Sequence, residues 1–185
     1  VMWVGTAVGV ARYDGHRFRV YAHDPADPHS LAPGLVNQVF EDRAGALWVV
    51  TPGALNRYDA ARDRWAHFLV EGPAPAGAAP REVNAVAEDA SGTFWVGTSA
   101  GLFAMDRRTG RARPFPLPRP AHVMRLLADS RGVVWVGTRT GLWQLGGRGG
   151  AAAPRFHPHV ARDPHALPDT LVLALAEDRA GAVWV

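Results

Sequence analysis

A four-residue stretch, Trp95-Val96-Gly97-Thr98, recurs along the chain and constrains its fold more than any other feature. Unchanged copies begin at Trp3 and Trp135, a copy with one substitution begins at Trp48, and a further copy starts at Trp184. The steps from Trp to Trp are 45, 47, 40 and 49 residues. A repeated unit of about 40–50 residues is typical of propellers and solenoids. The sequence therefore predicts repeat units of approximately 3–47, 48–94, 95–134 and 135–183, with a fifth begun at 184.

Alignment of the copies on their tryptophans brings an aspartate and a glycine into register. The Asp stands six residues before the Trp and the Gly three residues before it, at Asp42, Asp89, Asp129, Asp178, Gly45, Gly92, Gly132 and Gly181. This Asp-x-x-Gly pattern predicts a turn, because Asp can accept bonds from backbone N–H groups ahead of it and Gly accepts positive φ. Since these residues recur in every unit, we interpret them as scaffold. The same holds for Trp3, Trp48, Trp95, Trp135 and Trp184.

Each unit predicts four short strands. Examples are Val36–Glu41 for the first strand, Thr93–Thr98 for the second, Leu55–Tyr58 for the third, and Arg64–Phe68 or Arg111–Phe115 for the fourth. Four-stranded units at this spacing are typical of β-propeller blades, so we expect an all-β propeller of antiparallel blades. The sequence holds four first, third and fourth strands but five Trp strands. We therefore expect about four blades from a longer array, one of about seven blades per ring.

The connectors between fourth and first strands vary. His23–Leu35 and Arg162–Leu171 are versions of one loop, Glu71–Arg81 is rich in Pro and Ala, and Gly146–Pro154 is a Gly-rich insertion. Variable loops on a rigid scaffold are where recognition usually takes place.

Composition narrows the classes of function. The chain has no Cys and no Lys, and its net charge is +3 with arginines scattered among acids, so we expect no nucleic-acid site. The histidines His23, His29, His157, His159 and His165 lack a spaced carboxylate partner and are interpreted as loop residues. We expect no metal and no cofactor. The sequence has no run of about 18 apolar residues, so we expect no membrane helix within it. The chain begins and ends inside repeats, as expected of a segment.

No catalytic constellation is visible, since neither a Ser-His-Asp arrangement nor paired catalytic carboxylates stand out. The Asp-x-x-Gly spacing also differs from the sialidase Asp-box, in which the Asp precedes the Gly by two residues. Non-repeating polar and aromatic residues give the ligand-binding candidates Arg12, Arg57, Trp143 and Gln144. Arg beside Trp offers a hydrogen-bonding fork and a stacking face to a sugar ring.

The repeat pattern Val-x-x-Val-x-Glu-Asp-x-x-Gly-x-Leu-Trp-Val-x-Thr-x-x-Gly-Leu-x-x-Tyr-Asp resembles the two-component regulator propeller repeat, as does the connector Asp24–Leu31. The resemblance implies the extracytoplasmic sensor region of bacterial hybrid histidine kinases, where seven-bladed propellers in series precede a β-sandwich, a membrane helix and the kinase. The chain departs from the pattern at Val50, where Gly is usual, and at the Gly-rich insertion. These two departures concern local geometry and leave the expected fold unchanged.

The resemblance also implies a function. It favours a non-catalytic, periplasmic or extracytoplasmic sensor of an inner-membrane protein that binds an oligosaccharide or another small ligand. Its partners would be the remaining blades and a second sensor, and it would meet the membrane only through segments outside this chain. Two alternatives stay open, namely a propeller enzyme (lyase, glycosidase or quinoprotein) and a scaffold for protein partners.

Overall fold

The predicted all-β fold class is confirmed. A computed structural model describes residues 1–70, 82–146 and 153–185, which form strands, turns and loops without a helix. Within these residues no helix therefore has the length and hydropathy of a membrane span. The connector Glu71–Arg81 and most of the insertion Gly146–Pro154 lie outside the described residues. The chain divides into two compact units, Val1–Asn84 and Ala85–Val185.

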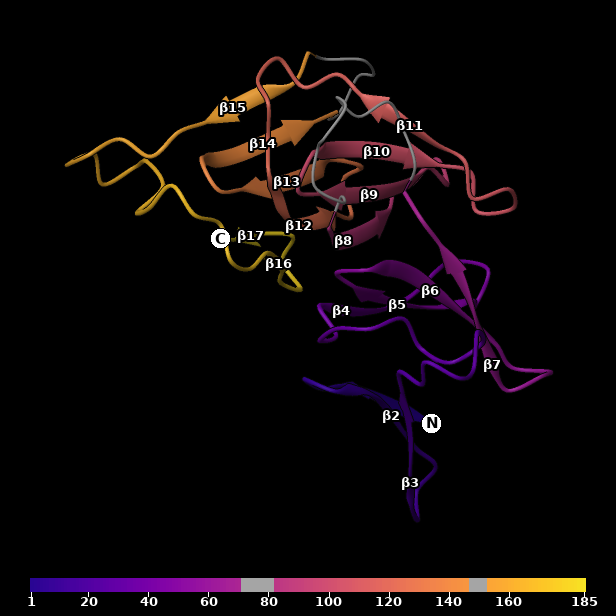
Figure 1. The fold of residues 1–185 in the computed structure, drawn as a ribbon. Helices are drawn as coiled ribbons and strands as arrows, with labels where there is room; N and C mark the ends of the chain where they lie inside the picture. Colours follow the sequence, from indigo (N-terminus) through magenta and orange to yellow (C-terminus); the bar gives the residue numbers. More distant parts are fainter. Residues whose placement is uncertain (71–81, 147–152) are drawn as a thin grey trace. The chain divides into compact units, whose positions relative to one another are not determined.

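The first unit contains two antiparallel sheets in which neighbouring strands are consecutive in sequence (Figure 1). One has three strands, β1 (Met2–Gly5), β2 (Gly9–Tyr13) and β3 (Phe18–Ala22). The other has four, β4 (Gln38–Glu41), β5 (Leu47–Thr51), β6 (Ala54–Asp59) and β7 (Arg64–Phe68). Val10, Tyr21, Leu31, Val49 and Trp65 form a shared buried cluster, which joins the two sheets.

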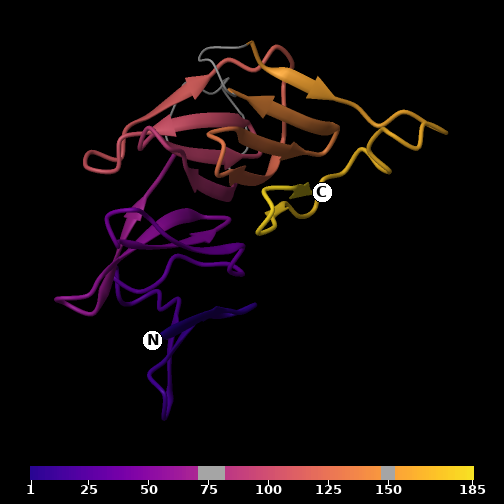
Figure 2. The same ribbon diagram turned by 180° about the vertical axis from the view of Figure 1, so that it is seen from behind.

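The second unit also consists of antiparallel sheets in which neighbouring strands are consecutive in sequence (Figure 1; Figure 2). One four-stranded sheet consists of β8 (Val83–Glu88, which begins at the boundary between the units), β9 (Phe94–Thr98), β10 (Gly101–Met105) and β11 (Ala112–Phe115). The next consists of β12 (Val123–Ala128), β13 (Val134–Thr138), β14 (Gly141–Leu145) and β15 (Arg155–His157). A two-stranded sheet of β16 (Ala176–Glu177) and β17 (Val183–Trp184) follows.

The strands agree closely with those expected from the pattern. The fourth strand Arg64–Phe68 has the expected bounds, and the second strand begins at Phe94 instead of Thr93. Each complete sheet takes its first strand from the residues before its own Trp, so the three complete sheets run over 38–68, 83–115 and 123–157. A unit counted from Trp to Trp thus contains three strands of one sheet and the first strand of the next.

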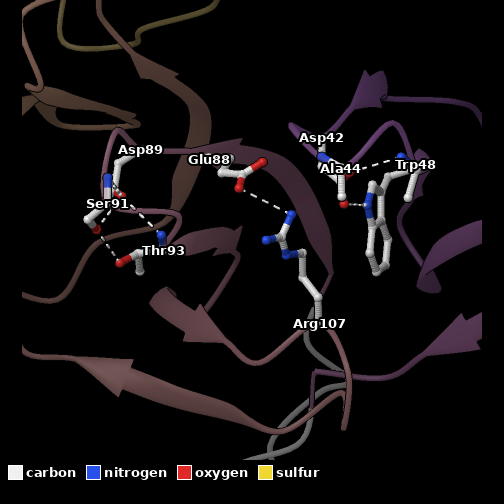
Figure 3. A network of polar contacts seen from close by, with 9 residues as sticks. Asp42, Ala44, Trp48, Glu88, Asp89, Ser91, Thr93 and Arg107 are labelled. Atoms are coloured by element: carbon white, nitrogen blue, oxygen red, sulfur yellow. Dashed lines mark hydrogen bonds and ion pairs between the residues drawn. The ribbon is translucent and has the colours of Figure 1, made fainter.

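The recurring Asp, Gly and Trp build one local device, which we call the Asp–Trp hook. In the copy at Asp42, Oδ1 accepts from the N–H groups of Ala44 and Ala46 at 3.0 and 2.9 Å, and Oδ2 accepts from Trp48 Nε1 at 2.8 Å (Figure 3). The glycine of this turn, Gly45, has φ +78°, which L side chains rarely adopt. Asp89, Asp129 and Asp178 accept from their own tryptophans at 2.8–2.9 Å. The hook closes the turn between first and second strands and fixes the indole's orientation, which explains its recurrence.

A second recurring feature is the close approach of the following segment to the glycine two residues after the Trp. A Cβ added at Gly97 would lie 2.4 Å from Val123 Cγ1, and one added at Gly137 would lie 2.5 Å from Val172 Cγ1. One unit has Val50 instead of Gly at this position. Val50 nevertheless pairs in regular register with Gln38 and Leu55 and is fully buried, so the strand continues without a break there.

Candidate functional site

Three of the four predicted ligand-binding residues share one structural position. Arg12, Arg57 and Gln144 lie directly opposite Trp3, Trp48 and Trp135 in the register between the second and third strands. Residues opposite each other in an antiparallel pair project from the same face of the sheet. Each of the three residues follows its Trp by nine positions, and this spacing places its polar side chain beside the repeated indole.

The other candidate, Trp143, is a core residue. It is 3% exposed and its ring lies 4.8 Å from the ring of Phe156, so its face is not offered at the surface. Its neighbour Gln144 pairs through Oε1 with His157 Nε2 at 3.1 Å. Burial, and to a lesser degree the charge of Arg155, lowers the pKa of His157 below its usual value. Ligand binding by Trp143 and Gln144 stays a prediction.

Arg57 lies in a different environment. Its guanidinium is 5.8 Å from the Trp48 ring and 5.3 Å from the Phe68 ring, which is cation–π geometry. In the described parts of the chain no carboxylate forms an ion pair with Arg57. The rings hold the guanidinium, and among residues 1–70, 82–146 and 153–185 no carboxylate is the partner of its hydrogen-bond donors.

Arg57 lines a groove beside the β6–β7 hairpin, which we call the hairpin groove. It has a volume of about 790 Å³, and its charged and ionisable lining residues are His29, Arg57, Tyr58, Asp59, Arg62, Arg64 and His67. Its volume falls within the range of small-ligand pockets, about 300–1,000 Å³.

The connector Asp24–Leu31 forms one wall of the hairpin groove. The carbonyl of His29 accepts from the Trp65 N–H of β7 at 2.9 Å, and His67 Nε2 donates to the carbonyl of Ser30 at 2.6 Å. The first bond uses a backbone N–H at the edge of β7, and the second uses a side chain of the same strand. At the start of the connector, His23 Nδ1 donates to the Leu31 carbonyl at 3.0 Å. The related second loop repeats this bond between His159 Nδ1 and the Leu167 carbonyl, at 2.7 Å. These histidines therefore shape loops.

Next to the hairpin groove lies a polar cluster that the sequence analysis missed. Tyr58 and Tyr21 both donate to Asp63 Oδ1, at 2.5 and 2.7 Å, and Arg19 forms an ion pair with Oδ2. Arg12 Nη1 donates to the Tyr58 hydroxyl at 3.3 Å. The hydrogen bonds from Tyr58 and then Tyr21 hold the pKa of Asp63 below its usual value. Burial is the main cause that raises the pKa of Tyr21. The cluster ties the first sheet to the second.

The only sequence signal for this cluster was weak. Tyr58 occupies a repeated position, ten residues after the Trp, but Asp63 has no counterpart in the pattern. Asp63 also adopts φ +54°, which is uncommon for a residue other than Gly but tolerated by Asp. In the part of the chain that the structure describes, no group of three or more His, Cys, Asp or Glu residues could hold a metal ion.

Comparison with known families gives one match, which lies on a single repeat of the chain. The model of the two-component regulator propeller matches residues 77–100, which contain the Asp89–Trp95 hook. Over these residues the chain is similar to the two-component regulator propeller repeat. No curated protein matches the chain.

Solved structures share the fold of this chain. The extracellular domain of a protein assigned as a hybrid two-component system from B. thetaiotaomicron superposes with a TM-score of 0.82 at 18% identity, covering 98% of this chain and 24% of that one. A second such domain from the same organism gives a TM-score of 0.58 at 16% identity, covering 98% and 30%. Virginiamycin B lyase from Staphylococcus aureus gives 0.57 at 15% identity, covering 84% and 55%. At these identities the likeness shows the fold alone, and the chain spans about a quarter to a third of the two extracellular domains.

Proposed function

We propose that the chain is part of the extracytoplasmic ligand-sensing propeller of a bacterial two-component sensor histidine kinase or a related transmembrane regulator. The observation that carries the proposal is the propeller-repeat match at residues 77–100, in a chain whose fold is shared over 98% of its length with such an extracellular domain. In this role the segment binds and does not catalyse.

The arrangement of side chains supports a binding role. The recurring Asp and Trp are used in hooks, while polar residues outside the Asp–Trp hooks gather around the β6–β7 hairpin and its connector. Such a division leaves the scaffold constant and the hairpins and connectors free to vary with the ligand. The ligand would be an oligosaccharide or another small molecule.

Signalling would follow from differential binding. A ligand that binds one packing arrangement of two sensor propellers more tightly than the other shifts the population toward it, and the shift alters kinase output. A shift from mostly inactive to mostly active needs a preference of roughly 10⁴-fold for the active arrangement. The remaining blades and a second sensor are the partners this mechanism requires.

The fold likeness to virginiamycin B lyase keeps an enzyme as the second candidate. A sensor and an enzyme differ in whether the bound compound is converted to a product. The full-length protein in membranes would be exposed to a panel of oligosaccharides, with kinase autophosphorylation and product formation measured in parallel. The proposal predicts an oligosaccharide that changes autophosphorylation and is recovered intact. Conversion of the bound compound would favour the enzyme, and a panel without any binding or response would favour a protein scaffold.

A further inference from the structure

We propose that the hairpin groove binds an acidic oligosaccharide, one that carries sulfate or carboxylate groups. This inference rests on the proposed sensor function and names the ligand class and the place of binding. The groove is lined by three arginines and one aspartate, so its lining is cationic although the whole chain is almost balanced in charge.

The single acid of the groove is already in use. Asp59 Oδ2 accepts from Arg62 Nη1 at 3.0 Å and lies 3.8 Å from Arg64 Nε, while Oδ1 accepts from the N–H groups of Ala61 and Arg62. The hydrogen bond from Arg62 is the main cause that lowers the pKa of Asp59. One carboxylate shared in this way leaves excess positive charge along the groove.

Arg57 and Arg64 are the residues best placed to hold an anion. Arg57 has no carboxylate partner in the described residues, and its position is fixed by the Trp48 and Phe68 rings. The side chain of Arg64 is 42% exposed, and its Nη1 lies 3.3 Å from His29 Nε2. A guanidinium held in this way presents a planar fork that matches sulfate and carboxylate oxygens. A concave cationic site also focuses the field on an approaching anion.

The aromatic residues of the groove argue against stacking as the means of recognition. Trp65 is 2% exposed, and the Tyr58 ring packs 5.1 Å from the rings of both Trp3 and Trp65. Single-stranded nucleic acids need aromatic faces on which bases stack, and neutral sugars commonly use such a face as well. The groove therefore favours a ligand recognised through its charges.

The same position in the second unit has the same character. A groove of about 500 Å³ beside the β10–β11 hairpin is lined by Arg108, Arg111, Arg113 and one acid, Asp106. Asp106 Oδ1 accepts from the N–H groups of Arg108 and Thr109, at 2.8 and 3.3 Å. An arginine-rich groove beside the third and fourth strands thus occurs in both units, each described by itself. A repeated charged ligand would suit a repeated site.

The test is calorimetric titration of the protein with four probes of matched length. These are a sulfated chondroitin tetrasaccharide, its desulfated form, neutral maltotetraose and oligothymidylate. We expect the sulfated probe to bind most tightly, the desulfated uronic acid form to bind more weakly, and the neutral probe not to bind. Binding should weaken as salt rises, because exposed charges are screened within about 8–10 Å near physiological ionic strength.

Variants locate the site. Replacing two charge-assisted contacts in Arg57→Gln/Arg64→Gln should weaken binding of the sulfated probe at least about tenfold. Arg64→Lys keeps the charge but not the fork and should give an intermediate loss. Arg17→Gln is the matched control, since the Arg17 side chain is 88% exposed and lies in the β2–β3 hairpin outside the groove. Unchanged thermal midpoints establish that each variant is folded.

Three results would overturn the inference: equal binding of the neutral probe, undiminished binding by the folded double variant, or equal binding of oligothymidylate. Its failure can be told apart from failure of the sensor proposal. A neutral sugar that changes kinase output would remove the acidic-ligand inference and leave the sensor intact. Groove-dependent binding of the sulfated probe without any change in kinase output would support the acidic-ligand inference and contradict the sensor proposal.

Discussion

Asp42→Asn should destabilise the chain far more than a change of one oxygen to nitrogen suggests. Both carboxylate oxygens of Asp42 act as acceptors, Oδ1 for two backbone N–H groups and Oδ2 for Trp48 Nε1. A carboxamide has only one acceptor oxygen, so one set of donors must face an NH₂ group. Asp42 is 6% exposed and Trp48 is fully buried, so water cannot replace the lost acceptor.

The expected loss follows from this geometry. A buried donor without a partner costs about 1–3 kcal/mol, and hydrogen bonds to charged groups are worth about 1.5–3 kcal/mol. We expect Asp42→Asn to lower the free energy of unfolding by about 2–3 kcal/mol. The assay is urea unfolding followed by far-UV circular dichroism. An unchanged m-value would show that the compared states are the same.

The chain supplies its own control in the last hook. Asp178 accepts from Ala180, Ala182 and Trp184 with bonds of 2.9 Å, and Gly181 has the same φ of +78° as Gly45. Trp184 is 66% exposed, so water can satisfy its N–H after Asp178→Asn, and the loss should be clearly smaller. The argument is that a buried donor left without an acceptor determines the cost. An equal loss of unfolding free energy in Asp42→Asn and Asp178→Asn, or no loss in Asp42→Asn, would refute it.

Three further predictions concern other contacts. Gly97→Ala should cost about 1–3 kcal/mol in urea unfolding, because the new Cβ would lie 2.4 Å from Val123 Cγ1. Tyr58→Phe removes one donor from Asp63 and should cost about 1 kcal/mol in the same assay, with a rise in the Asp63 pKa measurable by NMR. Burial acts to raise the pKa of Asp89, but its hydrogen bonds outweigh this and lower it. Its stabilising contribution is thus present above the unfolded pKa of about 3.9 and lost as pH falls through the lower folded value, so Asp89→Asn should flatten the acid side of a stability–pH curve.

Matched controls make these three predictions refutable. Gly53→Ala meets only ordinary contacts, 3.4 Å or more from Pro33, and should be nearly neutral. Tyr13→Phe removes a solvent-exposed hydroxyl bond to Gly15 and should leave the Asp63 pKa unchanged. An equal cost at Gly53, an equal pKa change in Tyr13→Phe, or an unaltered acid limb in Asp89→Asn would each contradict the reasoning for its pair.

The repeat architecture was determined by the sequence itself. Strand alternation, the Asp-x-x-Gly turn and the Trp six residues after the Asp are local features, and the bonds they form join residues at most six positions apart, such as Asp42 and Trp48. Since each copy makes the same turn, the pattern recurs and can be recognised in one chain. The alignment at Arg12, Arg57 and Gln144 also follows locally, from the two-residue side-chain period of paired strands.

The tertiary structure alone decided which polar side chains meet. Tyr21 and Asp63 are 42 residues apart and have no shared pattern, yet they bond because two sheets pack together. The same packing decided that Trp143 is a core residue and that Arg57 lies against two rings beside a groove. Contacts between sheets depend on distances that local periodicity does not encode, so the scaffold could be predicted from the sequence, whereas the candidate site required the structure.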